Sequence, residues 1–168
     1  HLARLMQGEV GVESVPGVGS LFWITLRVRR GKQRSGTRDA MVRGSRILVV
    51  DGLAEARQSH ADMLSTLGAE VGMASSGEEA LTMVSEADAR HQPYSAILLD
   101  WRMPNMDGLE TARKLGELPL EHSRPSIALV TAHDATALSD EARASSIQSV
   151  LNNPLTPSSM HAALQNLL

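Results

Sequence analysis

The chain has 168 residues. That is enough for one complete α/β domain and a shorter appended segment, since single domains commonly contain about 100 to 150 residues. Its formal net charge is -3, and we expect no nucleic-acid partner because nucleic-acid-binding domains usually carry a strong basic excess. The absence of cysteine excludes disulfides and thiolate metal sites. No apolar run approaches the roughly 18 residues of a membrane helix, so we expect no membrane contact by this segment and a cytoplasmic location, even if its parent is membrane-anchored.

Residues 1–29 are predicted to form a short helix followed by a β-hairpin. Val10, Val12 and Val15 precede the turn sequence Pro16-Gly17-Val18-Gly19-Ser20. The next segment, Leu21 to Val28, is dominated by β-branched and aromatic residues, as strands are. Two isolated strands are marginally stable at best, so this hairpin needs a larger sheet to join.

Residues 30–45 are predicted to be a flexible linker. The segment is rich in Arg, Lys, Gly and Ser and shows almost no apolar periodicity. A basic arm that contacts acidic lipid or nucleic acid is the alternative, but the composition favours a solvated tether.

Residues 46–168 are predicted to form an α/β domain with a five-stranded, doubly wound parallel sheet. Short apolar runs typical of buried parallel strands alternate with segments of helical periodicity, and right-handed crossovers place helices on both faces. The expected strands are Ile47–Val50, Val71–Ala74, Ala96–Leu99, Ile127–Val130 and Ser149–Asn152. A helix is expected after each strand, including one with a weak apolar stripe at about residues 138–144.

Two helix starts carry a capping pattern. Ser76 with Glu79 three residues later predicts a capping box. Thr156 followed by Pro157 predicts an N-cap and a proline in the first turn of the last helix.

Polar residues follow four of the five predicted strands: Asp51, Asp100, Thr131 and Asn153. In such a sheet the carboxyl ends of the strands converge on the ligand site. Taken alone, an aspartate after a strand is usually a turn former. Two neighbouring carboxylates, however, repel by roughly 4 kcal/mol at 4 Å in an effective dielectric near 20, which favours a bound cation such as Mg²⁺. A carboxylate there can act as a nucleophile toward phosphorus.

Four segments resemble the receiver domains of two-component response regulators: Ile47-Leu48-Val49-Val50-Asp51, Leu98 to Gly108, Val130-Thr131-Ala132 and Asn153-Pro154-Leu155-Thr156-Pro157. The resemblance implies a flavodoxin-like receiver fold. It further implies that Asp100 is the phosphoacceptor and that Asp51, Asp100 and the Arg102 backbone carbonyl form a Mg²⁺ site. Thr131 would supply the hydroxyl that holds the phosphoryl group, and the peptide bond before Pro154 would be cis.

Residues 1–28 resemble the end of a histidine kinase ATP-binding domain, through Leu5 to Ser14, Gly17-x-Gly19-Ser20 and Phe22-Trp23. Together, the two resemblances imply a hybrid sensor histidine kinase in a two-component phosphorelay. The implied partners are the kinase core of the same chain or a related histidine kinase, and a histidine phosphotransfer protein. The segment lacks the ATP site and the phosphorylatable histidine of such kinases, so we do not expect it to autophosphorylate.

Three positions depart from the receiver pattern. Gly52 replaces a second acid, Asn153 stands at the usual lysine position, and Val150 replaces a common aromatic switch residue. Mg²⁺ binding is therefore expected to be weak, and Asn153 can donate hydrogen bonds to a phosphate but cannot neutralise its charge. A pseudo-receiver that acts through protein contacts without phosphoryl transfer is the alternative, and an unrelated flavodoxin-like binding module is a more distant one.

The histidines suggest no site. His60 lies on the inward stripe of its helix and is expected to be partly buried. His91, His122, His133 and His161 lack metal-ligand spacing, and we assign them no role.

Overall fold

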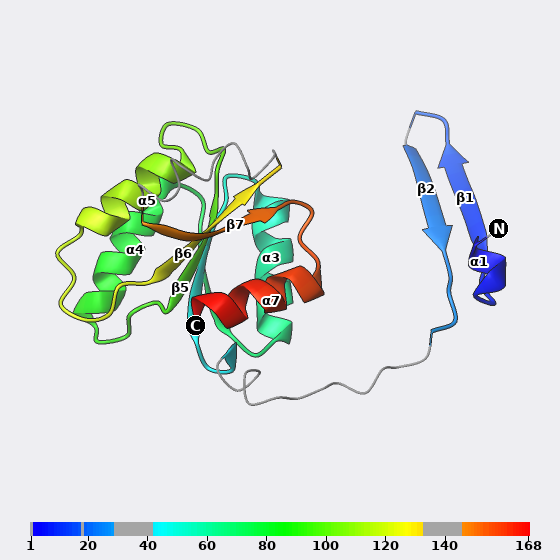
Figure 1. The fold of residues 1–168 in the computed structure, drawn as a ribbon. Coiled ribbons are helices and arrows are strands. Elements are labelled where there is room, and N and C mark those ends of the chain that lie inside the picture. Colours follow the sequence, from blue (N-terminus) through cyan, green and yellow to red (C-terminus); the bar gives the residue numbers. More distant parts are fainter. Residues whose placement is uncertain (1, 18, 29–41, 133–145) are drawn as a thin grey trace. The chain divides into compact units, whose positions relative to one another are not determined.

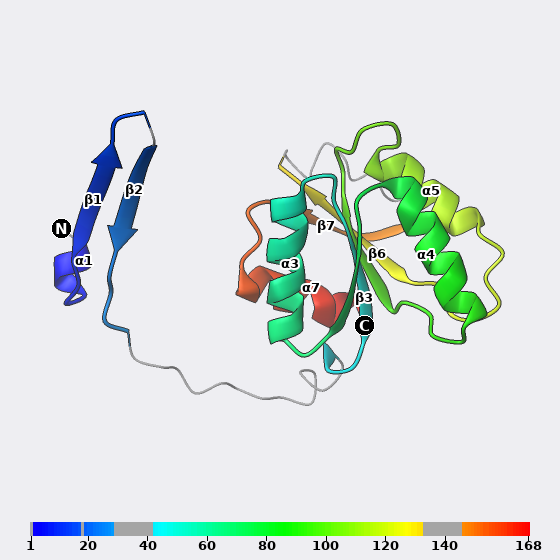
Figure 2. The same ribbon diagram turned by 180° about the vertical axis from the view of Figure 1, so that it is seen from behind.

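The structure is a computed structural model that describes residues 2–17, 19–28, 42–132 and 146–168 (Figures 1 and 2). The chain divides into two compact units, residues 1–34 and 35–168, and each is described by itself. Most of the predicted linker and the helix predicted at 138–144 lie outside the described residues.

The N-terminal unit contains the predicted helix and hairpin. Helix α1 (Leu2–Leu5) is followed by β1 (Val10–Val15) and β2 (Gly19–Ile24), which pair antiparallel from Val10 opposite Ile24 to Val15 opposite Gly19. Gly17 in the connecting turn has a φ of 78°, in the left-handed region that favours glycine. The second strand ends at Ile24, earlier than the sequence predicts.

The C-terminal unit contains the predicted parallel sheet. Its strand order is β4-β3-β5-β6-β7, and every neighbouring pair is parallel. The order reverses beside β3, so the doubly wound fold class is confirmed. The bounds are β3 Arg46–Val50, β4 Glu70–Ala74, β5 Ala96–Asp100, β6 Ser126–Thr131 and β7 Ile147–Asn152.

Helices cover both faces of this sheet (Figures 1 and 2). Helices α3 (Ala54–Thr66) and α7 (Pro157–Leu167) lie on one face, and α4 (Gly77–Ala89) and α5 (Gly108–Glu117) on the other. Within the described parts of the chain, none of the helices has the length and apolar character needed to span a bilayer.

The core alternates residue by residue along β3. Leu48 and Val50 pack in the cluster beneath α4 and α5, whereas Ile47 and Val49 pack in the cluster beneath α3 and α7. Because side chains of a strand point alternately to the two faces, a sheet covered on both sides needs apolar residues at every position. Burying each such side chain contributes about 1.5 to 3 kcal/mol. The rigid sheet built in this way positions the residues that follow its strands.

Ser76 and Thr156 are both N-cap residues, as predicted. The second bond of the capping box forms in α7 but not in α4. The Thr156 side chain accepts from the Ser159 N–H (3.1 Å) and the Ser159 hydroxyl accepts from the Thr156 N–H (2.9 Å), which completes a capping box. The Ser76 hydroxyl accepts from the Glu79 N–H (3.2 Å). The Glu79 carboxylate, however, accepts from the N–H and hydroxyl of Ser75, at 2.7 and 2.6 Å, because Ser75 offers it two donors.

Candidate functional site

The four polar residues predicted to converge lie at the carboxyl ends of four neighbouring strands. Val50 pairs with Leu99, so Asp51 and Asp100 follow directly on adjacent strands β3 and β5. Thr131 ends β6 beside β5, and the Asn153 N–H donates to the Thr131 carbonyl at 2.7 Å. Parallel pairing therefore gathers two carboxylates, a hydroxyl residue and an amide residue at one edge, which we call the acid edge.

Asp51 is buried and held by its neighbours. The residue is only 3% exposed, and its Oδ1 atom accepts a hydrogen bond from the Leu53 N–H at 2.8 Å. Its N–H donates to the Ala74 carbonyl at 3.1 Å, and its carbonyl accepts from the Arg57 guanidinium at 2.6 Å. Asp51 thus organises the turn into α3.

Asp100 is half-buried and electrostatically perturbed. Burial, and then the negative charge of Asp51, raise the pKa of Asp100 to about 6, although hydrogen bonds from the Arg102 and Trp101 N–H groups oppose the shift. The effect of Asp51 means that the two carboxylates lie close enough to repel each other. A cation between them would relieve this repulsion.

The loop after Asp100 folds back tightly over the end of β5. The Trp101 N–H donates to the Val130 carbonyl, and the Gly108 N–H donates to the Trp101 carbonyl, both at 2.9 Å. A Cβ atom at position 108 would lie 2.5 Å from the Asp100 carbonyl oxygen, so the return requires glycine. The Arg102 guanidinium lies over the Trp101 ring, 5.3 Å from its centroid. The orientation of the Arg102 carbonyl toward a metal stays a prediction.

Among the described residues, Gly52 has room for a Cβ atom at the acid edge. The nearest atom to a Cβ built at this position is Pro104 Cδ at 3.4 Å, an ordinary van der Waals contact. A Cβ atom, the first atom of any side chain, therefore fits there without strain. Among the residues that the structure describes, no group of three or more His, Cys, Asp or Glu side chains could hold a metal ion. A cation here would have to combine the two carboxylates with carbonyl and water oxygens, a set that suits Mg²⁺.

The structure also locates His60, Val150 and the peptide before Pro154. His60 was predicted to be partly buried and is buried; burial lowers its pKa, and the charge of Asp51 opposes this shift without cancelling it. Val150 is half-buried in β7 and packs against the cluster beneath α4 and α5. The Asn153-Pro154 peptide bond is cis. Sequence reasoning did not identify Arg57, whose spacing from Asp51, six residues, gives no signal of the contact.

The fold and these positions agree with one protein family. The chain belongs to the response regulator receiver domain family, which it matches over residues 47–165. Asp51 stands in the position expected for the family, and the domain is homologous to the receiver domains of hybrid histidine kinases.

Similar proteins extend the comparison. Sensor protein EvgS of Escherichia coli (strain K12) is 34% identical over 123 residues, which cover 70% of this chain and 10% of EvgS. Sensor histidine kinase AruS of Pseudomonas aeruginosa is 28% identical over 170 residues, which cover 98% of this chain and 16% of AruS. The crystal structure of the receiver domain of the histidine kinase CKI1 from Arabidopsis thaliana, complexed with Mg²⁺, has a TM-score of 0.61 and 30% identity, covering 68% of this chain and 86% of that chain. The chain thus spans only a small part of EvgS and AruS.

Proposed function

We propose that residues 46–168 accept a phosphoryl group on Asp100 within the phosphorelay of a hybrid sensor histidine kinase. The observation that carries the proposal is the half-buried Asp100 carboxylate at the acid edge, with its pKa raised to about 6 by burial and by Asp51. Such a carboxylate is ionised at neutral pH, yet its charge is poorly compensated. It is therefore well suited to attack phosphorus and to bind a cation.

The chemistry of transfer follows from the side chains at the acid edge. A carboxylate oxygen of Asp100 forms a bond to the phosphorus of a phosphohistidine, the P–N bond breaks, and its electron pair returns to the imidazole nitrogen. The Thr131 hydroxyl, buried at the end of β6, donates a hydrogen bond to a phosphoryl oxygen. Asn153 can add a hydrogen bond but no positive charge, so the phosphoryl group is held less firmly than by a lysine.

Asp51, Asp100 and the Arg102 carbonyl would hold Mg²⁺ at this edge. When bound, Mg²⁺ neutralises charge on the transferring phosphoryl oxygens. The similar CKI1 receiver, which is complexed with Mg²⁺, supports this assignment. Gly52 supplies no carboxylate, so we expect weaker binding than in a receiver with an acid at that position.

Residues 1–29 are proposed to be the C-terminal end of a histidine kinase ATP-binding domain, joined by a linker at 30–45 to the receiver. The AruS alignment supports this because it covers 98% of the chain. The hairpin also exposes large apolar side chains, with Phe22 78% and Leu21 61% exposed, as expected of strands that belong to a larger sheet. The kinase core of the same chain, or a related histidine kinase, and a histidine phosphotransfer protein are the proposed partners.

Acetyl phosphate provides a direct test. The chain is incubated with acetyl phosphate and Mg²⁺, and its intact mass is measured. We expect one phosphoryl adduct on the native chain and none on Asp100→Asn. Asp107→Asn is the matched control in the same loop, because asparagine can still cap α5 through the bond that Asp107 accepts from Glu110.

Two results would contradict the proposal: no adduct on the native chain at saturating Mg²⁺, or an adduct that persists in Asp100→Asn. The first result would favour a protein-interaction role without phosphoryl transfer, the alternative suggested by Gly52, Asn153 and Val150.

A further inference from the structure

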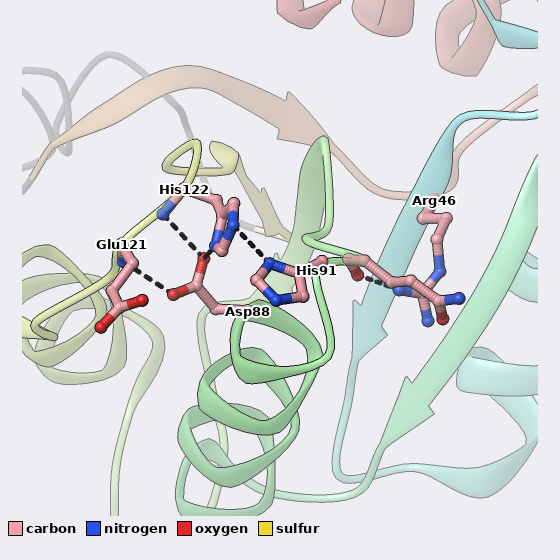
Figure 3. Close-up of polar contacts among 6 residues, drawn as sticks. Arg46, Asp88, His91, Glu121 and His122 are labelled. Atoms are coloured by element: carbon pink, nitrogen blue, oxygen red, sulfur yellow. Dashed lines mark hydrogen bonds and ion pairs between the residues drawn. The ribbon is translucent and has the colours of Figure 1, made fainter.

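Three titratable side chains form a connected chain at the end of the sheet opposite the acid edge (Figure 3). Asp88 lies in the last turn of α4, His91 on the turn that follows, and His122 in the connection between α5 and β6. These connections precede β5 and β6, so they lie at the amino ends of the strands, whereas Asp100 lies at the carboxyl end. The proposed phosphoryl transfer uses none of the three residues.

Asp88 fixes the orientation of the His122 ring. It is only 5% exposed, and its carboxylate accepts hydrogen bonds from the backbone N–H groups of Glu121 (2.7 Å) and His122 (3.1 Å). These bonds, the Glu121 bond first, lower the pKa of Asp88 and keep it ionised. The same carboxylate lies 3.1 Å from His122 Nδ1. Because an ionised carboxylate only accepts hydrogen bonds, Nδ1 carries the hydrogen and Nε2 of neutral His122 bears a lone pair.

That lone pair faces a second imidazole. His122 Nε2 lies 2.8 Å from His91 Nδ1, and the rings are nearly perpendicular, with centroids 4.7 Å apart. His91 has a φ of 58°, in the left-handed region, and its N–H donates to the Asp88 carbonyl at 2.9 Å. Glycine is the usual residue at such a helix end, but here the turn presents an imidazole toward His122. Both histidines are exposed residues.

We propose that His91 and His122 bind one Zn²⁺ ion, with Asp88 as the outer carboxylate. Two nitrogen ligands of a tetrahedral Zn²⁺ lie about 3.3 Å apart, so the two nitrogens need to separate by about half an ångström and turn toward a common point, and the hydrogen that His91 Nδ1 donates to His122 Nε2 has to move to His91 Nε2. The Asp88–His122 pair already has the carboxylate–histidine arrangement that orients metal ligands. The described residues supply no third His, Cys, Asp or Glu ligand, so water completes the coordination.

Calorimetric titration of the full chain with Zn²⁺ tests the site. Saturating Mg²⁺ is present throughout to occupy the acid edge. Both His91→Ala and His122→Ala change exposed side chains and should weaken binding at least tenfold, and Asp88→Asn should weaken it by about tenfold through loss of the outer carboxylate. His161→Ala, in α7 on the other face of the sheet, is the matched control and should bind as the native chain does.

Nitrogen NMR of histidine-labelled chain gives an independent readout. Zn²⁺ should shift the His91 Nδ1 and His122 Nε2 resonances and leave those of His161 in place. The proposal is overturned if the His91→Ala, His122→Ala double variant binds Zn²⁺ as tightly as the native chain. It is also overturned if Zn²⁺ binds in a reference titration without Mg²⁺ but not in the presence of saturating Mg²⁺, which would place the ion at the acid edge. Neither result depends on whether Asp100 is phosphorylated.

Discussion

Asp88 and Asp100 lie at opposite ends of the same sheet, and the protein treats their charges in opposite ways. Asp88 is the less solvent-exposed of the two, yet its pKa is lowered, because N–H donors of the 121–122 segment solvate it. Asp100 is half-buried, yet its pKa is raised to about 6, because its two backbone hydrogen bonds do not offset burial and the charge of Asp51. The balance between hydrogen bonding and burial decides whether a carboxylate stabilises the fold or remains available for chemistry.

The largest expected effect is on the free energy of unfolding, when a glycine at either end of α5 is replaced by alanine. Gly108→Ala forces a Cβ to within 2.5 Å of the Asp100 carbonyl oxygen, whereas Gly116→Ala, later in the same helix, finds Ser146 Oγ at 3.4 Å as its nearest contact. We expect Gly108→Ala to lower the free energy of unfolding by about 3 kcal/mol. Gly116→Ala should raise it by up to about 1 kcal/mol, because alanine favours helix. Urea unfolding measures both, and equal losses would show that the acid edge has no special need for glycine.

The raised pKa of Asp100 predicts a pH-dependent reaction. A carboxylate must be ionised to attack phosphorus, so at low Mg²⁺ the phosphorylation rate should fall about tenfold between pH 7 and pH 5. Carbon NMR of the Asp100 carboxyl should titrate near 6. In Asp51→Asn its pKa should fall without reaching its ordinary value, because burial is the larger cause. A rate that stays constant down to pH 4.5 would contradict this account of Asp100.

The acid edge can be supplied with the ligand that it lacks. Gly52→Asp places a third carboxylate on a Cβ whose nearest contact among the described residues is Pro104 Cδ at 3.4 Å, and we expect Mg²⁺ affinity to rise about tenfold, equivalent to about 1.4 kcal/mol. Gly52→Ala adds the same Cβ without a ligand and should leave the affinity unchanged. Mg²⁺ titration of both variants decides whether the added carboxylate or the loss of glycine changes the Mg²⁺ affinity. Equal Mg²⁺ affinities of Gly52→Asp and Gly52→Ala would exclude a role for the carboxylate.

The smallest expected effects are the changes in stability caused by Asp100→Asn and Asp88→Asn, which should have opposite signs. Asp100 has a folded-state pKa raised above its ordinary 3.8, so its charge opposes folding above about pH 6 and this penalty disappears as pH falls below 3.8. Asp100→Asn should therefore stabilise the chain at pH 7.5 by about 1 kcal/mol, a figure reduced for solvent screening of a partly exposed group. The gain should vanish in acid.

Asp88→Asn should change the stability in the opposite direction to Asp100→Asn. Because the folded-state pKa of Asp88 is lowered, its contribution to stability is present above the unfolded-state pKa and is lost as pH falls through the folded value. The variant should be destabilised at pH 7.5, with a smaller loss in acid. Thermal unfolding across pH measures the two variants side by side, and effects of the same sign would contradict the contrast between the ends.

Much of the acid edge could be predicted from sequence, because buried parallel strands have apolar runs and the residues that follow them must meet at one edge. Asp51, Asp100, Thr131 and Asn153 were placed in this way, and the N-caps Ser76 and Thr156 follow from local chemistry. The family resemblance then assigned their roles, which stay predictions until phosphorylation is measured.

The opposite end could not be predicted. His91 and His122 are 31 residues apart on two loops, and no spacing rule relates them. Asp88 interrupts the apolar stripe of α4, a signal that was available but that does not reveal its partners. The pKa of Asp100 depends on burial and on the approach of Asp51, and the free space at Gly52 depends on Pro104; both are properties of the folded chain.

The central claim is that Asp100 carries the phosphoryl group, and locating that group tests it most directly. The phosphorylated chain is reduced with borohydride, which converts an aspartyl phosphate to homoserine, and is then digested and sequenced by mass spectrometry. We predict homoserine at position 100 and at no other aspartate. Homoserine at Asp51 or Asp107, with unmodified aspartate at 100, would contradict the account.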